Sequence, residues 1–395
     1  MAGSRAGLTV RPMITDRNIV CIASNWFEHP TSKHHVMRSL AGRNHIVWVN
    51  YHASRRPSLV GADSRMILRR LRQIWSGPRR VAPAIDVLSP LLVPLPASRA
   101  ARFFNARATA SAVRAALRRL PRRPAQLWLF TPDAPELIDL LRPERVVYYC
   151  VDEFSAFTGY DAELMNRLER RTLERADVVI TTSDELQQRI AALRPDAKLV
   201  PHGVDVAHFA AATTASESAP PRDIDDIPAP VLGYFGLISD YVDLELLAEV
   251  ARRRPDWSLV LLGAIRCDVS VLRGLPNVHL LGGKPYQDLP AYCRRFDVGL
   301  IPFRVNRLTR AVNPIKLREY LAAGLPVVST PLPAVRAYAP AVRIADTPKD
   351  FAAACAAALV DRREGSARER QELVRAESWQ SRVETLSELV MGGAS

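Results

Sequence analysis

Lys316 and Glu319 are the two residues whose types and spacing point most directly to binding chemistry. They lie in a segment whose apolar pattern predicts a strand at residues 298–303, a loop, a helix and another strand. Asn313 is a favourable helix N-cap, and Pro314 suits a first helical position. Because a helix start favours anions and residues one turn apart share a face, we expect Lys316 to meet a phosphate and Glu319 a sugar diol. An ordinary helix with a solvated Lys–Glu pair is the alternative.

A second candidate is Asp152, which directly follows a buried strand expected at residues 146–151. Ligands of open parallel sheets bind at the carboxyl ends of the strands, so this carboxylate should lie at the mouth of the sheet. There it can act as a general base, or it can simply cap its strand. Gly236 ends another expected strand, at residues 231–236, and would let the backbone approach a ligand closely.

The chain that must position these residues suits two domains of ordinary size, since it has 395 residues. Strand-like runs alternate with amphipathic helical segments, which predicts an α/β fold. Residues 210–230 are rich in Ala, Thr, Ser and Pro with an acidic patch, and this composition predicts a linker. The patch Asp223-Ile-Asp225-Asp226 imitates a metal-binding DxD motif, but its position in a linker argues against that role.

The composition, 48% hydrophobic and 24% charged, is that of a soluble globular protein. Five scattered cysteines without a CxxC motif favour reduced thiols in the cytoplasm over a disulfide frame or a zinc site. No apolar run approaches the roughly 20 residues that span a bilayer, and the N-terminus lacks the apolar core of a signal peptide. We therefore expect a cytoplasmic protein.

The net charge of +13 is unevenly distributed. Residues 1–200 hold 31 Lys/Arg against 18 Asp/Glu, whereas residues 201–395 hold 23 of each. Residues 55–123 alone contain 16 basic and two acidic residues, and two stretches there, 66–75 and 101–120, place apolar and basic residues at helical spacing. Such helices can lie on an anionic membrane surface; the alternative is a packed helix with a solvated arginine face. Nucleic acid is not expected as a partner, because no binding motif accompanies the charge.

The segment PIKLREYLAAGLPVV, residues 314–328, resembles the donor site of nucleotide-sugar-dependent glycosyltransferases with the GT-B fold. These are the group 1, family 4-like enzymes of bacterial exopolysaccharide and cell-wall polymer synthesis, including teichuronic acid and glucuronosyltransferase-like relatives. ADVVITTS at residues 176–183 and VPHGVD at residues 200–205 resemble the end of the acceptor domain in this class.

The resemblance implies two Rossmann-like, doubly wound parallel-sheet domains that face a cleft. The acceptor domain would span residues 1–209 and the donor domain residues 231–365, and residues 366–395 would form a C-terminal helix that returns to the first domain. It also implies donor-binding roles for Gly236, Lys284, Arg307, Asn313, Pro314, Ile315, Lys316 and Glu319. In many relatives the first loop and helix face the acceptor, which makes Trp26, Lys33, His34 and His35 acceptor-site candidates; the two histidines can equally be exposed residues at a helix start.

Retaining members of the broader class carry two glutamates separated by seven residues. The second corresponds to Glu319, but the position of the first is Ala311. An inverting transfer instead needs one base, and Asp152 resembles the base aspartate of inverting bacterial glucuronosyl- and glucosyltransferases. The resemblance implies no cofactor and no metal, since the nucleotide-sugar is a substrate.

The expected function is therefore transfer of a sugar from a UDP-, GDP- or dTDP-sugar to a lipid-linked or polysaccharide acceptor. The enzyme would work at the inner face of the cell membrane as a peripheral protein. A nucleotide-sugar epimerase or hydrolase on the same fold is one alternative. A non-catalytic protein that binds polyanions or membranes through residues 55–123 is the other.

Overall fold

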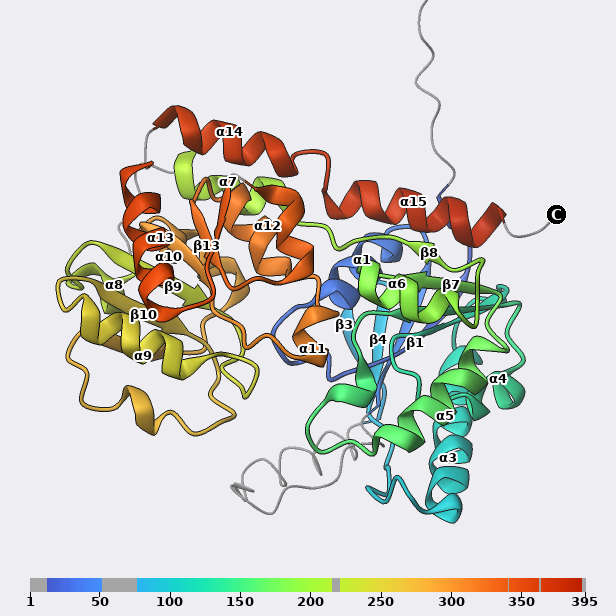
Figure 1. The fold of residues 1–395 in the computed structure, drawn as a ribbon. Coiled ribbons are helices and arrows are strands. Elements are labelled where there is room, and N and C mark those ends of the chain that lie inside the picture. The colour runs from blue at the N-terminus through green and yellow to red at the C-terminus, as the bar shows by residue number, and fades with distance from the viewer. Residues whose placement is uncertain (1–12, 52–76, 215–220, 340, 362–363, 393–395) are drawn as a thin grey trace, which may run out of the picture.

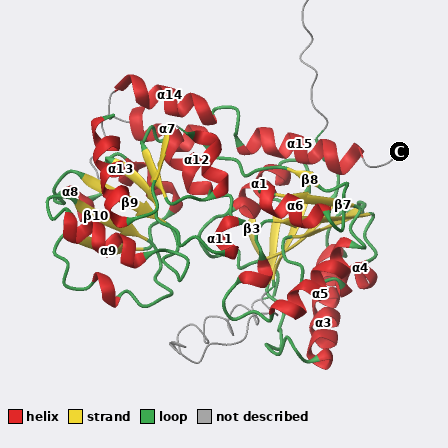
Figure 2. Cartoon of the chain, viewed as in Figure 1, coloured by secondary structure: helices red, strands yellow, loops and turns green. Residues whose placement is uncertain are grey.

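The structure is a computed structural model that describes residues 13–51, 77–214, 221–339, 341–361 and 364–392. Two separate sheets, each covered by helices, form two lobes that lie side by side (Figure 1). The N-terminal part of the chain builds one lobe and the C-terminal part builds the other, and helices and strands alternate through both (Figure 2). The α/β prediction is confirmed.

The first sheet has the strand order β3-β4-β2-β1-β5-β6-β7-β8. All neighbours pair in parallel except β3 and β4, which form an antiparallel pair at one edge. The strands are β1 (Asn18–Ala23), β2 (His45–Asn50), β3 (Arg79–Ala82), β4 (Ile85–Leu88), β5 (Ala125–Leu129), β6 (Arg145–Cys150), β7 (Val178–Thr181) and β8 (Lys198–Leu199).

The second sheet has the order β11-β10-β9-β12-β13-β14 and is parallel throughout. Its strands are β9 (Val231–Phe235), β10 (Ser258–Leu262), β11 (Val278–Gly282), β12 (Val298–Ile301), β13 (Val327–Ser329) and β14 (Val342–Ile344). The central strands of both sheets are continuous apolar runs buried on both faces, as parallel sheets between helices require.

Helices α1 to α6 belong to the first lobe and α8 to α13 to the second. The helices, in chain order and including α7, α14 and α15, are α1 (Ser32–Ala41), α3 (Arg99–Leu117), α4 (Glu136–Leu141), α5 (Ala162–Leu173), α6 (Asp184–Ala191), α7 (Val206–Thr214), α8 (Arg222–Asp225), α9 (Leu244–Arg253), α10 (Leu289–Cys293), α11 (Arg307–Arg310), α12 (Ile315–Ala322), α13 (Pro348–Val360), α14 (Glu364–Val374) and α15 (Trp379–Gly392). Short 3₁₀ turns add η1 (Phe154–Ala156), η2 (Ser270–Leu272), η3 (Tyr286–Asp288) and η4 (Pro333–Tyr338).

The last two helices run across both lobes. In Figure 1, α14 lies over the second lobe and α15 continues over the first. Helix α15 packs against α1, and Trp379 at its start is buried in the core of the first lobe. The backbone of Ser378 bridges to Val204 just before α7. Both connections between the lobes therefore meet at one side of the molecule.

The arginine-rich region departs from its sequence pattern. The amphipathic stretch at residues 66–75 lies outside the described residues. Helix α3 forms within the predicted stretch 101–120, but its apolar residues do not all lie on one buried face. Phe103 and Phe104 are 59% and 49% exposed, whereas Ala110 and Val113 are fully buried. Among the described helices, none has the length and apolar character needed to cross a membrane.

Candidate active site

Lys316 and Glu319 lie together near the start of α12, at the carboxyl end of β12. Burial raises the pKa of the Glu319 carboxyl, and the Lys316 ammonium opposes that rise. Burial likewise lowers the pKa of Lys316, and Glu319 opposes that shift. The two side chains thus influence one another's pKa near a helix start, where a negatively charged ligand is favoured.

Gly236 follows β9 with a φ of +132°, and its neighbour is Lys316. A Cβ built on Gly236 would lie 2.3 Å from Cε and 2.5 Å from Nζ of Lys316. The lysine ammonium also lies 5.4 Å from the ring centre of Tyr234 and 5.8 Å from that of Phe303. The missing side chain at position 236 therefore makes room for the lysine, whereas the sequence predicted room for a ligand.

The predicted cap of α12 is wrong. Pro314 occupies the N-cap position and the helix starts at Ile315. The Asn313 side chain instead donates from Nδ2 to the carbonyl of Thr182 in the first lobe, at 2.8 Å, and accepts from Arg318 at 2.5 Å. Ile315 packs against the core of the first lobe. Asn313 is only 8% exposed at a junction between lobes, so its amide must satisfy partners there and is unavailable as a cap.

Asp152 follows β6, and its side chain is half-buried. Burial raises the pKa of its carboxyl to about 6, and the Lys33 ammonium opposes the rise. Burial lowers the pKa of Lys33, while Asp152 acts in the opposite direction. In the second lobe, the pKa of the Tyr241 phenol is raised, first by burial and second by the charge of Asp152. The charge of Asp152 therefore acts on a cation of its own lobe and on a phenol of the other.

A cavity of about 320 Å³ opens between the lobes, and Tyr241 is one of the residues that line it. From the first lobe Ala156 and Thr158 line it, and from the second Asp240, Tyr241 and residues 306–308. The Thr158 hydroxyl donates to the Asp240 carboxylate at 2.6 Å across the gap. Both polar and apolar side chains line the cavity, which lies at the carboxyl ends of both sheets, where a substrate of this architecture is expected.

Tyr286 was not predicted, yet it joins the lobes near Glu319. Its ring stacks on His208 at 4.6 Å and contacts His29 and His35 of the first lobe, at 5.9 Å and 5.3 Å. Burial raises the pKa of its phenol, with Glu319 the next cause. The hydroxyl is buried and makes no hydrogen bond with any described residue. The sequence alone shows only that an aromatic residue follows Gly-Gly-Lys-Pro, and this pattern does not predict a contact between the lobes.

Two predicted acceptor residues are buried in the first lobe and cannot face a cleft. His34 is fully buried and stacks between Trp26 and Trp48, with ring centres 5.1 Å and 4.7 Å away. Its ring also bonds to Thr31, which begins α1. Trp26 is 9% exposed and its backbone N–H donates to Asn50 at 2.8 Å.

His35, in contrast, reaches the interface between the lobes. It stacks on Trp379 with ring centres 5.0 Å apart and planes 2° from parallel. Burial lowers its pKa to about 4, so the ring is neutral at neutral pH.

Lys284 does not lie free in a donor pocket. Its ammonium is 2.5 Å from the Asp223 carboxylate, which also accepts from the Tyr292 hydroxyl at 2.8 Å. Asp223, in the segment that the composition predicted to be a linker, lies in α8, and its carboxylate joins α8 to α10. Among the described residues, no group of three or more His, Cys, Asp or Glu side chains is arranged to hold a metal ion.

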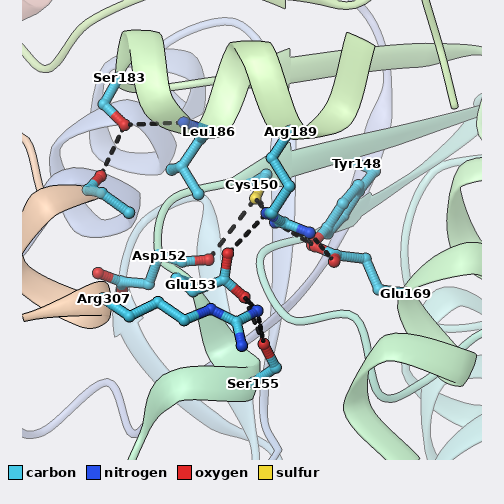
Figure 3. Close-up of polar contacts among 11 residues, drawn as sticks. Tyr148, Cys150, Asp152, Glu153, Ser155, Glu169, Ser183, Leu186, Arg189 and Arg307 are labelled. Carbon is cyan, nitrogen blue, oxygen red and sulfur yellow. Dashed lines mark hydrogen bonds and ion pairs between the residues drawn. The ribbon is translucent and has the colours of Figure 1, made fainter. Parts of the chain in front are cut away.

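Arg307, predicted to bind the donor, reaches across to the first lobe. Its Nη2 donates to the Ser155 hydroxyl at 2.9 Å and lies 3.4 Å from Oε1 of Glu153 (Figure 3). Ala311, at the position where a retaining enzyme carries a glutamate, is 5% exposed and packs against the core of the first lobe. At this position the chain therefore makes an apolar contact with the first lobe, where a retaining enzyme has a glutamate carboxylate.

Comparison with known proteins agrees with this geometry. The sequence profile of the family described as glycosyl transferases group 1 matches residues 229–361, the lobe that contains α12. TuaH of Bacillus subtilis (strain 168), a protein whose name assigns it to the glycosyltransferases of teichuronic acid biosynthesis, is 32% identical over 275 residues, which cover 64% of this chain and 68% of TuaH.

Solved structures with this fold include HepE of Anabaena in complex with UDP, with a TM-score of 0.64 and 13% identity over 96% of this chain and 100% of HepE. The trehalose 6-phosphate synthase of Burkholderia multivorans gives a TM-score of 0.66 and 14% identity over 96% of this chain and 99% of that one. These likenesses show the fold, and the family match and the identity to TuaH show the family. The chain belongs to the group 1 glycosyltransferases: it is a nucleotide-sugar-dependent transferase with the GT-B fold.

Proposed function

We propose that this enzyme is an inverting glycosyltransferase in which Asp152 is the general base. The single observation that carries the proposal is the position of Asp152, half-buried after β6, where its charge acts on Lys33 of its own lobe and on Tyr241, a residue that lines the interdomain cavity. A carboxyl with a pKa of about 6 is ionised at neutral pH and basic enough to take a proton from a hydroxyl in the transition state.

In this reaction the acceptor hydroxyl attacks the anomeric carbon of the donor sugar. Its O–H proton passes to Asp152, a bond forms between the acceptor oxygen and the anomeric carbon, and the bond to the diphosphate breaks on the opposite face. The leaving nucleoside diphosphate carries the electron pair away. Lys316 and the N-terminus of α12 offset its charge, so the step as proposed needs no metal.

The donor residues we propose are Lys316, Glu319 and Tyr286, with Gly236 giving Lys316 its position. Glu319 is 6% exposed, and a buried carboxylate is stabilised by a ligand that donates hydrogen bonds to it, such as a ribose diol. The buried Tyr286 hydroxyl faces the same need. HepE is solved with UDP and with UDP-glucose, which supports a UDP-sugar as the first donor to test.

The acceptor we propose is a lipid-linked or polymeric glycan of cell-surface polysaccharide synthesis, reached at the inner face of the membrane. TuaH supports this by its name, which points to teichuronic acid biosynthesis. Helix α3 adds a physical reason: Phe103, Phe104 and the preceding Leu95 are 49–59% exposed, and Arg107 lies 4.1 Å over the Phe103 ring. Exposed aromatic and aliphatic side chains beside arginines suit the interface of an anionic bilayer.

The function is tested by calorimetry with UDP, GDP and dTDP, followed by incubation of the matching sugar donors with bacterial lipid extracts. We expect one nucleotide to bind and its donor to yield a product whose new glycosidic bond has inverted anomeric configuration by NMR. A product with retained configuration would contradict the role of Asp152, and binding of none of the three nucleotides would contradict the proposal as a whole.

A further inference from the structure

Glu153, the residue after Asp152, is a buried carboxylate whose two oxygens face different partners. It is 3% exposed. Its Oε2 lies 2.6 Å from Nε of Arg189, on α6 of the same lobe. Its Oε1 accepts from the Ser155 hydroxyl at 2.5 Å and faces Arg307 of the other lobe at 3.4 Å. One carboxylate therefore connects the interior of the first lobe with a side chain of the second (Figure 3).

The partner inside the first lobe is firmly held. Arg189 also pairs with Glu169 of α5, donating from Nη2 to Oε1 at 3.0 Å. Glu169 is 6% exposed and accepts a further bond from the Tyr148 hydroxyl of β6 at 2.7 Å. Because these groups come from β6, α5 and α6 of a single lobe, they stay together whatever the second lobe does.

The partner from the second lobe is different, because it arrives only when the lobes meet. Three further hydrogen bonds join the lobes around it: Ser183 donates to the Ala311 carbonyl at 2.6 Å, Asn313 to the Thr182 carbonyl at 2.8 Å, and Thr158 to Asp240 at 2.6 Å. Together they seat α11 on the carboxyl ends of β6 and β7, and Figure 1 shows α11 between the two lobes. If the lobes separate, the contacts of Arg307 with Glu153 and Ser155 must break.

The charges in this network balance only in the closed arrangement. Glu153 and Glu169 carry two negative charges, and Arg189 and Arg307 carry two positive ones. Withdrawing Arg307 leaves Arg189 alone between two buried carboxylates, an arrangement that low-dielectric surroundings penalise. The chain at Glu153 then loses its restraint from the second lobe, and Asp152 is the adjacent residue. In Figure 3 the Asp152 side chain points away from Arg189, outside the network.

We propose that Glu153 is a positioning residue that couples closure of the two lobes to the placement of Asp152, through an interdomain clasp of Arg307, Glu153 and Ser155. The inference rests on the proposed role of Asp152 as base. It assigns Arg307 to the clasp, whereas the sequence assigned it to the donor. The physical reason is that Arg189 offsets the charge of the buried Glu153 carboxylate only in part, because Arg189 also pairs with Glu169. Arg307 of the second lobe can therefore form a stabilising charge-assisted hydrogen bond with Glu153.

The test compares Arg307→Met with Arg307→Lys. Arg307 is 62% exposed, so both variants should fold. We expect Arg307→Met to lower kcat about 10- to 100-fold while the donor KM changes less than about 3-fold, because a lost charge-assisted hydrogen bond is felt in placement of the base. Arg307→Lys should recover most of kcat. An unchanged kcat in Arg307→Met, or a loss confined to the donor KM, would overturn the clasp.

Arg304→Met is the matched control. Arg304 lies on the same loop but pairs with Glu245 at 2.6 Å within its own lobe, so its loss removes an ion pair without touching closure. We expect its kcat to stay within about 2-fold of the wild type. Glu153→Gln weakens the contact with Arg307 and also the ion pair with Arg189, so it should lower kcat at least as much as Arg307→Met. The double variant should be little worse than Glu153→Gln alone, because the contact between residues 153 and 307 is already lost. Additive losses would contradict the coupling.

Small-angle scattering separates failure of the clasp from failure of the proposed function. With saturating UDP, the wild type and Arg304→Met should become more compact than Arg307→Met. If UDP binds none of these proteins, the donor assignment fails. The clasp is then tested by scattering from the proteins without ligand, in which Arg307→Met should be more expanded than Arg304→Met. Superimposable scattering curves in both conditions would overturn the clasp whatever the substrate.

Discussion

Gly236 and Lys316 share one small space: a Cβ on Gly236 would lie 2.3 Å from Cε of Lys316. The glycine thus fixes the path of a lysine that comes from a different strand–helix unit. The φ of +132° at Gly236 is the reason that the backbone favours glycine, and a Cβ added there would in addition displace the end of the Lys316 side chain.

Gly236→Ala should therefore displace the Lys316 ammonium and weaken binding of the nucleoside diphosphate about 10-fold or more, measured by calorimetry. Gly274→Ala is the matched control: its φ is +78°, but nothing lies within 4 Å of the added Cβ. Both variants should lose about 1 kcal/mol or more of stability from backbone strain. Equal nucleotide affinity in the two variants would show that Lys316 does not contact the nucleotide.

The pH dependence of the reaction follows from Asp152. A base must be ionised, and the pKa of this carboxyl is raised to about 6, so kcat/KM should rise with pH through about 6 and level off above it. Lys33→Met removes the positive charge that favours the ionised form, so the acid limb should move up by about one unit. A limb that stays in place in Lys33→Met would separate the observed pKa from Asp152.

Tyr286→Phe tests whether the unpartnered phenol meets a ligand. Because the hydroxyl makes no bond to a described residue, its removal should leave the melting temperature unchanged or slightly raised. Donor affinity should fall by about 5- to 10-fold if the hydroxyl bonds to the donor. Tyr292→Phe gives the opposite pattern, since its hydroxyl donates to Asp223: stability should fall and affinity should hold. Unchanged affinity in both would remove Tyr286 from the site.

Membrane association is tested on α3. Phe103→Ser with Phe104→Ser should reduce co-sedimentation with vesicles that contain anionic phospholipid by about 10-fold, because two exposed aromatic rings supply much of the apolar contact. Leu193→Ser and Val360→Ser, exposed elsewhere on the surface, serve as controls. Equal sedimentation of the two double variants would place the membrane contact, if there is one, outside α3.

The sequence was informative wherever function depends on local pattern. Strand–helix alternation predicted the α/β architecture, and the sequence pattern predicted that Lys316 and Glu319 lie on one helix, as they do in α12; their shared role in a donor site stays a prediction. What could not be predicted depends on partners distant in sequence. Asn313 has the chemistry of a cap, but Thr182, 131 residues away, takes its amide. The sequence around Lys284 indicates no partner for its ammonium, but in the structure the ammonium forms an ion pair with the Asp223 carboxylate.

The burial of individual side chains is the second feature that the sequence pattern could not predict. His34 and His35 are adjacent and chemically identical, yet one stacks inside a tryptophan cluster and the other reaches Trp379 at the interface. Helix periodicity turns neighbouring residues about 100° apart, so a pair at a helix start cannot both face one space. An error of one residue in the predicted helix register therefore changes which of the two is expected to face the second lobe.

The most direct test of the account is turnover by Asp152→Asn. The amide keeps the size of the side chain but cannot accept the acceptor proton as a carboxylate does, so transfer should fall at least about 1,000-fold while the nucleotide dissociation constant stays within about 3-fold. Full turnover in Asp152→Asn, with nucleotide binding intact, would contradict the central claim that this carboxylate is the base.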